Sequence, residues 1–266
     1  MLQQNRMVAA RANISSWHAA SYTGRSIRIA VLDPERFLYN YQAGAIQRPL
    51  GESGKAGGHL GQCCAVLQQI APEAELFALG TDRAAWEWVL ANDIDIVSCS
   101  YAAGAINAAL LPRLEQSNLI TLAAAGNGSN LETGADRAYP SCYDWTVSVG
   151  AYCPNLNQLE PYTNGGEALD CVAYTDFAVL NNQGKVIAFT GTSCATAVAA
   201  GMMALVLQKE GRKKGWRWAR EYIKQHSKEL LEPGKDLASG YGLFSLPEVE
   251  EGTVEIRMKI GRKLPI

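Results

Sequence analysis

The sequence predicts an α/β fold, a three-layer sandwich in which a mostly parallel central sheet lies between layers of helices. Two observations support this prediction. Short β-branched or apolar segments alternate with longer helical ones, which is the pattern of repeated βαβ units. The segment 26–32, SIRIAVL, becomes continuously apolar toward its end. Such a run is typical of a strand that is buried on both faces of a parallel sheet.

The composition is that of a globular protein with a sizeable core. The chain has 266 residues, of which 48% are apolar and 19% charged, and its formal net charge is −2. We expect a single catalytic domain at 15–266, with 1–14 as an N-terminal extension and 250–266 as a C-terminal strand or tail. The near-neutral charge gives no electrostatic basis for nucleic acid or a membrane as a partner.

The cysteines form neither a disulfide framework nor a zinc-site spacing. Their odd number and the apolar surroundings of several favour free thiols and a reducing compartment. A bridge from Cys171 to Cys153 or to Cys142 stays open as an alternative. No apolar signal segment opens the chain, so we expect a cytoplasmic protein, with a mature secreted form as the alternative. The cysteines are Cys63, Cys64, Cys99, Cys142, Cys153, Cys171 and Cys194.

In the first half of the chain the predicted elements alternate at short intervals. Strand 26–32 ends at Asp33-Pro34, and the Gly-rich connection 51–58 then leads through His59 to a helix. That helix stops before Pro72, because proline cannot continue it. Segment length and β-branched content separate the remaining strands from helices. They give a helix at 63–70, a strand at 74–79, a helix at 84–91 and a strand at 94–100.

The second half continues the alternation up to a long apolar run. We expect a helix at 105–116 and strands at 119–124, 146–150 and 185–189. The run that follows the last strand and extends to Leu207 is too long for an ordinary strand, so it predicts a buried helix.

Two C-terminal segments have distinct patterns. Segment 212–228 mixes basic residues with tryptophan and tyrosine. We interpret it as an amphipathic surface helix whose aromatic residues pack inward, and a nucleic-acid surface is the alternative. Residues 254–260 alternate between apolar and polar side chains, which predicts a half-buried or edge strand.

Polar residues follow three predicted strands at or near their carboxyl ends: Asp33, Ser100 and Asn127. In open parallel sheets the working residues gather at these ends. For Asp33 or Asn127 alone, a turn at the end of the strand is the simpler explanation. Together they mark this edge of the sheet as a candidate site.

Ser193 lies where a strand turns into the buried helix. A hydroxyl at such a place usually caps the helix, so Ser193 alone is weak evidence for catalysis. A serine nucleophile needs a general base and an acid that orients it. His18 and His226 fall in other predicted helices, whereas His59 opens a helix of small residues after a Gly-rich loop. Asp33, His59 and Ser193 stand in one of the chain orders in which the catalytic triad occurs.

The motifs resemble those of the subtilisin-like serine proteases (subtilases, peptidase family S8). SIRIAVLD is similar to the aspartate motif, and HLGQCCA to the histidine motif of variants with a cysteine four residues after the histidine. LAAAGNG is similar to the oxyanion-hole motif and GTSCATAVAAG to the serine motif. IAPEAELFAL, IDIVSCSYAAG, AYPSCYDWTVSVGAY and GYGLFSL match further landmarks. The resemblance covers most of 15–245 and implies a subtilisin-like fold.

The departures from the family pattern indicate a divergent and compact member. Pro34-Glu35 replaces the small residue and glycine that usually follow the aspartate, and Leu60-Gly61 replaces Gly-Thr after the histidine. Ala197 and Val198 stand where the family has proline and histidine. None of these changes removes a catalytic group.

The resemblance implies a role for each site residue. Ser193 is the expected nucleophile, His59 the general base, and Asp33 the residue that orients the imidazole. The side chain of Asn127 and the N–H of Ser193 are the expected oxyanion donors.

The resemblance also implies where a peptide binds. Residues 98–102, with Ser100, Tyr101 and Ala102, are expected to offer an edge to an extended peptide. The side chain before the cleaved bond would enter between this edge and Ala124, Ala125 and Gly126, with Ala138 near the pocket floor. These small, uncharged walls favour an apolar or medium-sized side chain.

The expected function is that of a serine endopeptidase, with a dedicated processing protease for a precursor or leader peptide as a narrower hypothesis. A transpeptidase or macrocyclase that uses the same acyl-enzyme is one alternative. A catalytically silent fold that binds peptides is another. The expected partner is a polypeptide or peptide, without nucleic acid or membrane. We expect no cofactor and no metal, since no calcium-loop motif occurs.

Overall fold

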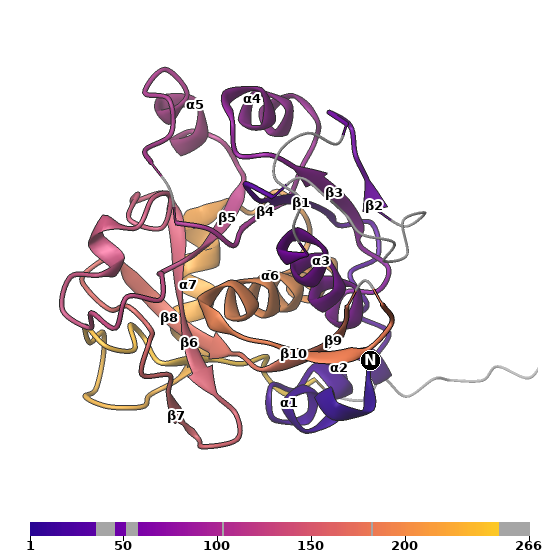
Figure 1. Cartoon of the computed structure of the whole chain (residues 1–266), viewed down its shortest axis with the longest axis vertical. Coiled ribbons are helices and arrows are strands. Elements are labelled where there is room, and N and C mark those ends of the chain that lie inside the picture. The colour runs from indigo at the N-terminus through magenta and orange to yellow at the C-terminus, as the bar shows by residue number, and fades with distance from the viewer. Residues whose placement is uncertain (36–45, 52–57, 103, 182, 250–266) are drawn as a thin grey trace, which may run out of the picture.

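The computed structural model describes residues 1–35, 46–51, 58–102, 104–181 and 183–249 (Figure 1). The predicted strand at 254–260 lies outside these residues. The helical segments are η1 (Gln3–Asn5), α1 (Arg6–Arg11), α2 (Ile14–Ala19), α3 (His59–Ile70), α4 (Arg83–Ala91), α5 (Leu111–Glu115), η3 (Ala135–Arg137), α6 (Gly191–Glu210) and α7 (Trp216–His226).

A large, mostly parallel sheet forms the centre of the molecule, in the strand order β11-β12-β8-β6-β5-β4-β1-β3-β2. Among the paired strands of this sheet, only the short β7 and β11 run antiparallel to their neighbours. Its strands are β1 (Arg28–Leu32), β2 (Ile46–Gln47), β3 (Glu75–Leu79), β4 (Ile96–Cys99), β5 (Ile120–Ala124), β6 (Thr146–Cys153), β7 (Gln158–Leu159), β8 (Leu169–Tyr174), β11 (Ser227–Lys228) and β12 (Leu243–Phe244). A separate hairpin pairs β9 (Phe177–Leu180) with β10 (Val186–Phe189).

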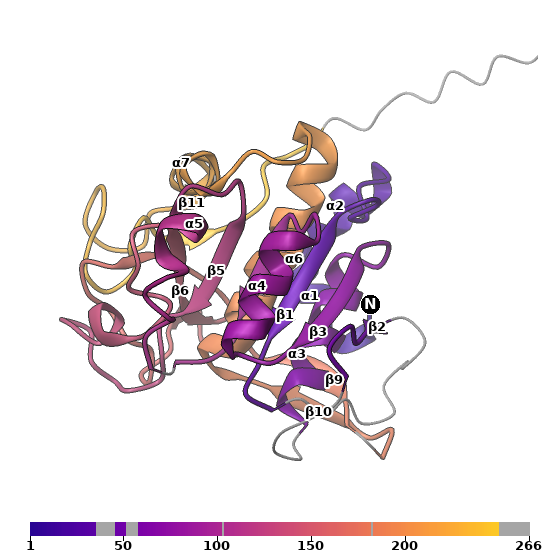
Figure 2. The same ribbon diagram turned by 90° about the horizontal axis from the view of Figure 1, so that it is seen from above.

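Helices cover both faces of the sheet, and alternate residues of β1 show this directly. Ile29 and Val31 join one core cluster, which contains the buried faces of α3 and α6. Ala30 and Leu32 join a second cluster, which contains residues of α4 and α5. Successive side chains of a strand point to opposite faces, so the two clusters are the two sides of one sheet. The predicted three-layer α/β class is confirmed, and Figure 2 shows α6 running alongside the strands.

α6 is the central helix of the larger cluster. Every residue from Cys194 to Leu207 is buried. By length and composition alone, this 20-residue helix is apolar enough to cross a membrane. However, 94% of its apolar 18-residue stretch is buried inside the fold. Gly201 permits a close approach of α6 to α3, because a Cβ there would lie 2.8 Å from the side chain of Ile70. Packing on the sheet and on α3 accounts for the apolar character of α6.

Two predicted helices are shorter than expected. The segment 105–116 is helical only over α5, with Pro112 in its first turn. Proline fits there and nowhere later, since it has no N–H to donate and blocks the preceding turn. The segment 212–228 is helical only over α7, because Lys213 and Gly215 have positive φ angles of 61° and 81°. α7 buries Ala219 and Ile223 and packs Trp218 and Tyr222 partly inward, so its prediction as an amphipathic surface helix is confirmed.

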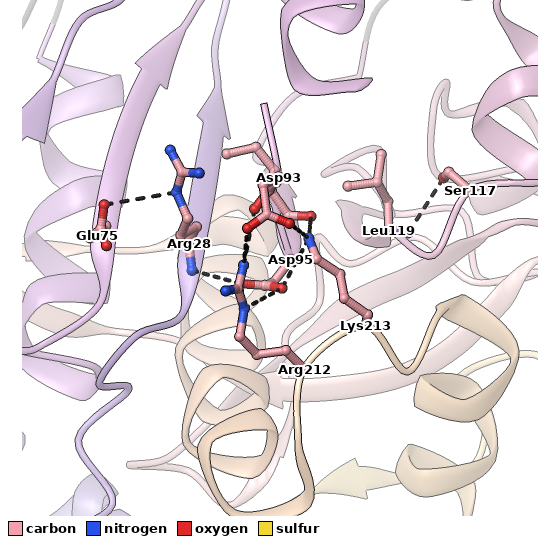
Figure 3. Close-up of polar contacts among 9 residues, drawn as sticks. Arg28, Glu75, Asp93, Asp95, Ser117, Leu119, Arg212 and Lys213 are labelled. Atoms are coloured by element: carbon pink, nitrogen blue, oxygen red, sulfur yellow. Dashed lines mark hydrogen bonds and ion pairs between the residues drawn. The ribbon is translucent and has the colours of Figure 1, made fainter. Parts of the chain in front are cut away.

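The connection from α6 to α7 forms hydrogen bonds and ion pairs with the loop before β4 (Figure 3). Arg212 Nε donates to the buried Asp95 carboxylate at 2.9 Å, and Asp95 also accepts from the N–H of Arg28. A hydrogen bond from Lys213, and a smaller contribution from one by Arg212, lower the pKa of Asp93 to about 2. These contacts join both sides of the sheet at the amino ends of its strands.

The N-terminal residues pack onto the rest of the fold. Asn5 is buried, and its side chain exchanges two hydrogen bonds with the backbone of Ala178 in β9, at 2.7 and 2.8 Å. Trp17 is also buried, and its indole N–H donates to the carbonyl of Pro247. The predicted boundary at residue 14 stays a prediction.

All seven cysteines are free, and all except Cys142 are buried. The two disulfide alternatives involving Cys171 therefore do not form in this structure.

Candidate active site

Asp33 is the first residue beyond β1, and its side chain is buried. Its backbone N–H donates to the carbonyl of Leu79 in the neighbouring strand β3. The two carboxylate oxygens have separate partners: Oδ1 accepts from the N–H of Glu35 at 2.8 Å, and Oδ2 bonds to Nδ1 of His59 at 2.5 Å. These partners satisfy both oxygens of a carboxylate whose burial without hydrogen bonds would be costly.

His59 is the first residue of α3, where Gly58 at the N-cap has no side chain to offer. The N–H of His59 donates instead to Oε2 of Glu35 at 3.1 Å. The imidazole makes a T-shaped contact with the ring of Phe189, with centroids 5.5 Å apart. Because Nδ1 is bound to Asp33, Nε2 is the nitrogen left to accept a proton from another group.

The environment raises the pKa of His59 above its ordinary value of 6.5. Burial opposes this shift because it penalises the imidazolium, but the contact with Cys63 and the hydrogen bond and charge of Asp33 outweigh it. Cys63 lies one turn along α3, with its Sγ 3.9 Å from Nδ1. The contacts that orient the ring therefore also make it a stronger base than an exposed histidine.

Ser193 is half-buried in the first turn of α6. Its hydroxyl donates to the carbonyl of Ser100 at 3.0 Å, and the hydroxyl of Ser100 donates back to the carbonyl of Ser193 at 3.0 Å. Within the described part of the chain, the hydroxyl of Ser193 makes no hydrogen bond to His59. A hydroxyl has one proton to donate, so Ser193 must leave the carbonyl of Ser100 before it can donate to another group.

Asn127 follows β5 and is exposed. Its Oδ1 accepts from both the N–H and the hydroxyl of Thr192 at 2.9 Å. A backbone N–H can only donate, so the oxygen must face Thr192 and Nδ2 must face away from it. Among the described residues Nδ2 has no hydrogen-bond partner, which leaves it able to donate to a bound molecule.

Gly191 allows the start of α6 to approach Asn127 this closely. Its φ angle is 90°, which L side chains rarely adopt, and a Cβ there would lie 3.2 Å from Nδ2 of Asn127. Its N–H donates to the hydroxyl of Tyr162 at 3.0 Å. Backbone freedom and lack of bulk are thus both needed at this position.

The first group of predicted substrate-binding residues follows β4. Ser100 and Tyr101 are buried, whereas Ala102 is exposed. The ring of Tyr101 belongs to the core cluster that contains α4, where it packs with Trp86. The side chain of Tyr101 is therefore part of the core and has little surface left to contact a substrate.

The second group lies at the end of β5. Ala124, Ala125 and Gly126 are all buried, as is Ala138 after η3. Gly126 has a φ angle of 97°, and a Cβ on it would meet Nδ2 of Asn164 at 2.6 Å. The assignment of both groups to substrate binding stays a prediction.

Asn164 is a residue of the site that the sequence did not indicate. Its Oδ1 accepts from the N–H groups of Gly128 and Asn130, at 2.9 and 3.3 Å, and its Nδ2 donates to the carbonyl of Ala125 at 3.0 Å. It therefore braces the loop that carries Asn127 from both sides. The polar segment around it predicts only a loop, and no sequence signal marks this contact.

Two groups of described residues each bring three possible metal-ligand atoms within 4.8 Å of one another. The first group is Asp33, His59 and Cys63, and the second is Cys153, Glu160 and Asp176. In the first, Asp33 and His59 already use theirs for their mutual hydrogen bond. In the second, made of Cys153, Glu160 and Asp176, burial raises the pKa of the Cys153 thiol. A metal needs the thiolate, so this shift works against binding there.

Comparison with known proteins finds a family and several relatives. The model of the subtilase family matches residues 58–242, a range that contains His59, Asn127 and Ser193 but not Asp33. Subtilisin E of Bacillus subtilis (strain 168) is 28% identical over 225 residues, which cover 72% of this chain and 58% of the relative. An intracellular serine protease of Paenibacillus polymyxa is 29% identical over 197 residues, covering 66% of this chain and 56% of the relative.

Solved structures show the same fold at lower identity. A lanthipeptide protease has a TM-score of 0.71 and 16% identity, covering 91% of this chain and 93% of its own. A serine protease of a type VII secretion system has a TM-score of 0.71 and 17% identity, covering 90% and 86%.

The subtilisins that match are longer than the matched region, which spans 58% of subtilisin E. The family match covers well over half of the present chain. The order of the motifs, the parallel sheet and the family match agree, and the chain belongs to the subtilase family.

Proposed function

We propose that this chain is a serine endopeptidase that forms an acyl-enzyme on Ser193. The observation that carries the proposal is the 2.5 Å hydrogen bond between Asp33 and Nδ1 of His59. It fixes the imidazole in the tautomer that leaves Nε2 free to act as a base. A histidine held in this way is the central requirement of a serine triad.

The reaction would start when the Ser193 hydroxyl leaves the carbonyl of Ser100 and turns toward His59. His59 takes the proton as Oγ attacks the scissile carbonyl, and Asp33 stabilises the imidazolium that results. His59 then gives the proton to the leaving amine, the carbon–nitrogen bond breaks, and water hydrolyses the acyl-enzyme by the same route.

Three groups face the negative charge that develops on the carbonyl oxygen. Nδ2 of Asn127 has no partner among the described residues, and the N–H of Ser193 lies in the first turn of α6. The N-terminal end of this 20-residue helix adds a partial positive charge. Such preorganised donors usually supply the largest single contribution to catalysis.

The proposed substrate is a polypeptide or peptide that lies along residues 98–102. The small residues at the end of β5 and Ala138 support a preference for an apolar or medium-sized side chain before the cleaved bond. A dedicated role in processing a precursor or leader peptide is the narrower proposal. The fold likeness to a lanthipeptide protease motivates a test of it. Seven free cysteines support a reducing, cytoplasmic location.

A fluorophosphonate probe tests the proposed nucleophile, because it reacts only with an activated serine. We expect stoichiometric labelling of Ser193, found by peptide mass spectrometry, and no labelling or peptide cleavage in Ser193→Ala. Ser100→Ala removes a hydroxyl that bonds to the carbonyl of Ser193 but keeps the nucleophile, so this variant should still be labelled. Unchanged cleavage by Ser193→Ala would refute the proposal.

One observation favours the catalytically silent alternative: the Ser193 hydroxyl bonds to Ser100 and not to His59. A silent peptide-binding fold would bind peptides yet resist the probe, whereas the enzyme should react with it. Product analysis with an added amine separates hydrolysis from transpeptidation, since both share the acyl-enzyme.

A further inference from the structure

We propose that Glu35 is a positioning residue that holds His59 against Asp33, an inference that rests on the proposed protease function. Glu35 contacts both partners of the proposed triad. Its N–H donates to Oδ1 of Asp33 at 2.8 Å, and its Oε2 accepts from the N–H of His59 at 3.1 Å. With the 2.5 Å bond between Asp33 and His59, these contacts close a ring of three hydrogen bonds.

The ring matters because the chain connects Asp33 and His59 only indirectly. They are 26 positions apart, one at the end of β1 and the other at the start of α3. Glu35 stands two residues after Asp33, so its side chain makes a short bridge between the strand and the helix. The bridge fixes the position of the first N–H of α3 relative to the end of β1.

The start of α3 has no capping group of its own. Its N-cap is Gly58, no side chain of the helix caps it, and its first turn contains no acidic residue. A helix of this length leaves N–H groups and a partial positive charge at its start, where a carboxylate is favoured. Glu35 supplies that carboxylate from another part of the chain, at the residue whose side chain does the chemistry.

The two contacts of Glu35 can be separated by mutation. The bond to Asp33 uses the backbone of Glu35, which a substitution other than proline retains. The bond to His59 uses only the side chain. Glu35→Ala therefore removes the bridge to α3 and leaves the support of Asp33, while Glu35→Gln keeps a neutral acceptor in the same place.

Kinetics on active-site-titrated enzyme test the positioning role. We expect Glu35→Ala to lower kcat about 10-fold with little change in KM, because small displacements of a catalytic group slow the chemical step. Glu35→Gln should recover most of this loss. Glu87→Ala, which breaks an exposed ion pair with Arg83 on α4, is the control for loss of a surface carboxylate. A purely structural role would lower the titrated fraction but leave kcat per active site unchanged, and this result would overturn the inference.

A second measurement does not depend on turnover. The proton between His59 Nδ1 and Asp33 should give a far-downfield NMR signal in the resting protein. We expect this proton to exchange with water several-fold faster in Glu35→Ala than in wild type or in Glu35→Gln. Equal exchange in all three proteins would refute the role of Glu35 even if protease activity is present. Faster exchange in Glu35→Ala supports it even if Ser193 proves unreactive.

Discussion

At the scale of single residues, Asn127 is held by its oxygen, which leaves its nitrogen for the substrate. Thr192 supplies two donors to Oδ1, and a flip of the amide would leave the backbone N–H of Thr192 facing another donor. The same contact satisfies an N–H at the start of α6, next to Ser193. One asparagine therefore caps the helix of the proposed nucleophile and presents a donor beside it, which explains why capping and catalysis are not competing explanations here.

The raised pKa of His59 makes a prediction about pH at the same scale. The proposed base must be neutral, so kcat/KM should rise with pH through the folded-state pKa, with a midpoint above 6.5. Cys63→Ala should lower the midpoint, because the contact of Cys63 Sγ with His59 Nδ1 is one cause of the raised pKa. Peptide cleavage measured across pH gives both values. Cys142→Ala, which alters a half-buried thiol elsewhere, is the control, and a wild-type midpoint at or below 6.5 contradicts the prediction.

At the scale of elements, local patterns predicted β1, β3 to β6, β10, α3, α4 and α6, because strand burial and helix length leave a signal in the sequence. β8 was not predicted, since Asp170 interrupts an otherwise apolar segment. This acid is buried and pairs with Arg220, with Nε and Oδ1 2.9 Å apart. A partner 50 positions away leaves no local signal.

The residues of the candidate site likewise fall into those that local sequence patterns indicate and those that they do not. Asp33, His59, Asn127 and Ser193 could be predicted because each lies at the end of a recognisable element and the motifs stand in a known order. Glu35 and Asn164 could not, since they act through hydrogen bonds to residues 24 and 36 positions away. In the sequence, Glu35 stands out only as a departure from the family pattern. Its contacts suggest that the departure supports the site.

The loop after β5 gives a prediction about Asn164. Asn164→Ala removes three hydrogen bonds that hold this loop, so kcat should fall and the free energy of unfolding should drop by about 1–3 kcal/mol. If Asn164 acts through Asn127, the double variant with Asn127→Ala should have a kcat no lower than Asn127→Ala alone. Additive losses in kcat would show that Asn164 acts independently. Urea unfolding and steady-state kinetics provide the two readouts.

At the scale of the whole molecule, α3 starts at His59, α6 carries Ser193 in its first turn, and the two helices pack together behind the candidate site. Gly201→Ala would place a Cβ 2.8 Å from Ile70 and push the helices apart. We expect a loss of stability of about 1–3 kcal/mol, together with a fall in kcat. Ile70→Ala removes the contact with Cγ2 but keeps the contact with Cβ at 2.8 Å, so the two substitutions should be coupled and not additive. Independent effects of the two substitutions in a double-mutant cycle would contradict the contact.

The burial of α6 also limits how such a protein can adapt. The helix that presents the proposed nucleophile is also the most thoroughly enclosed segment of the larger core, from Cys194 to Leu207. A substitution that changes thermal stability by repacking this helix must also shift the position of Ser193. Evolution and engineering would therefore find independent routes to stability on the outer face of α7 and in the loops, where altered packing does not reach the chemistry.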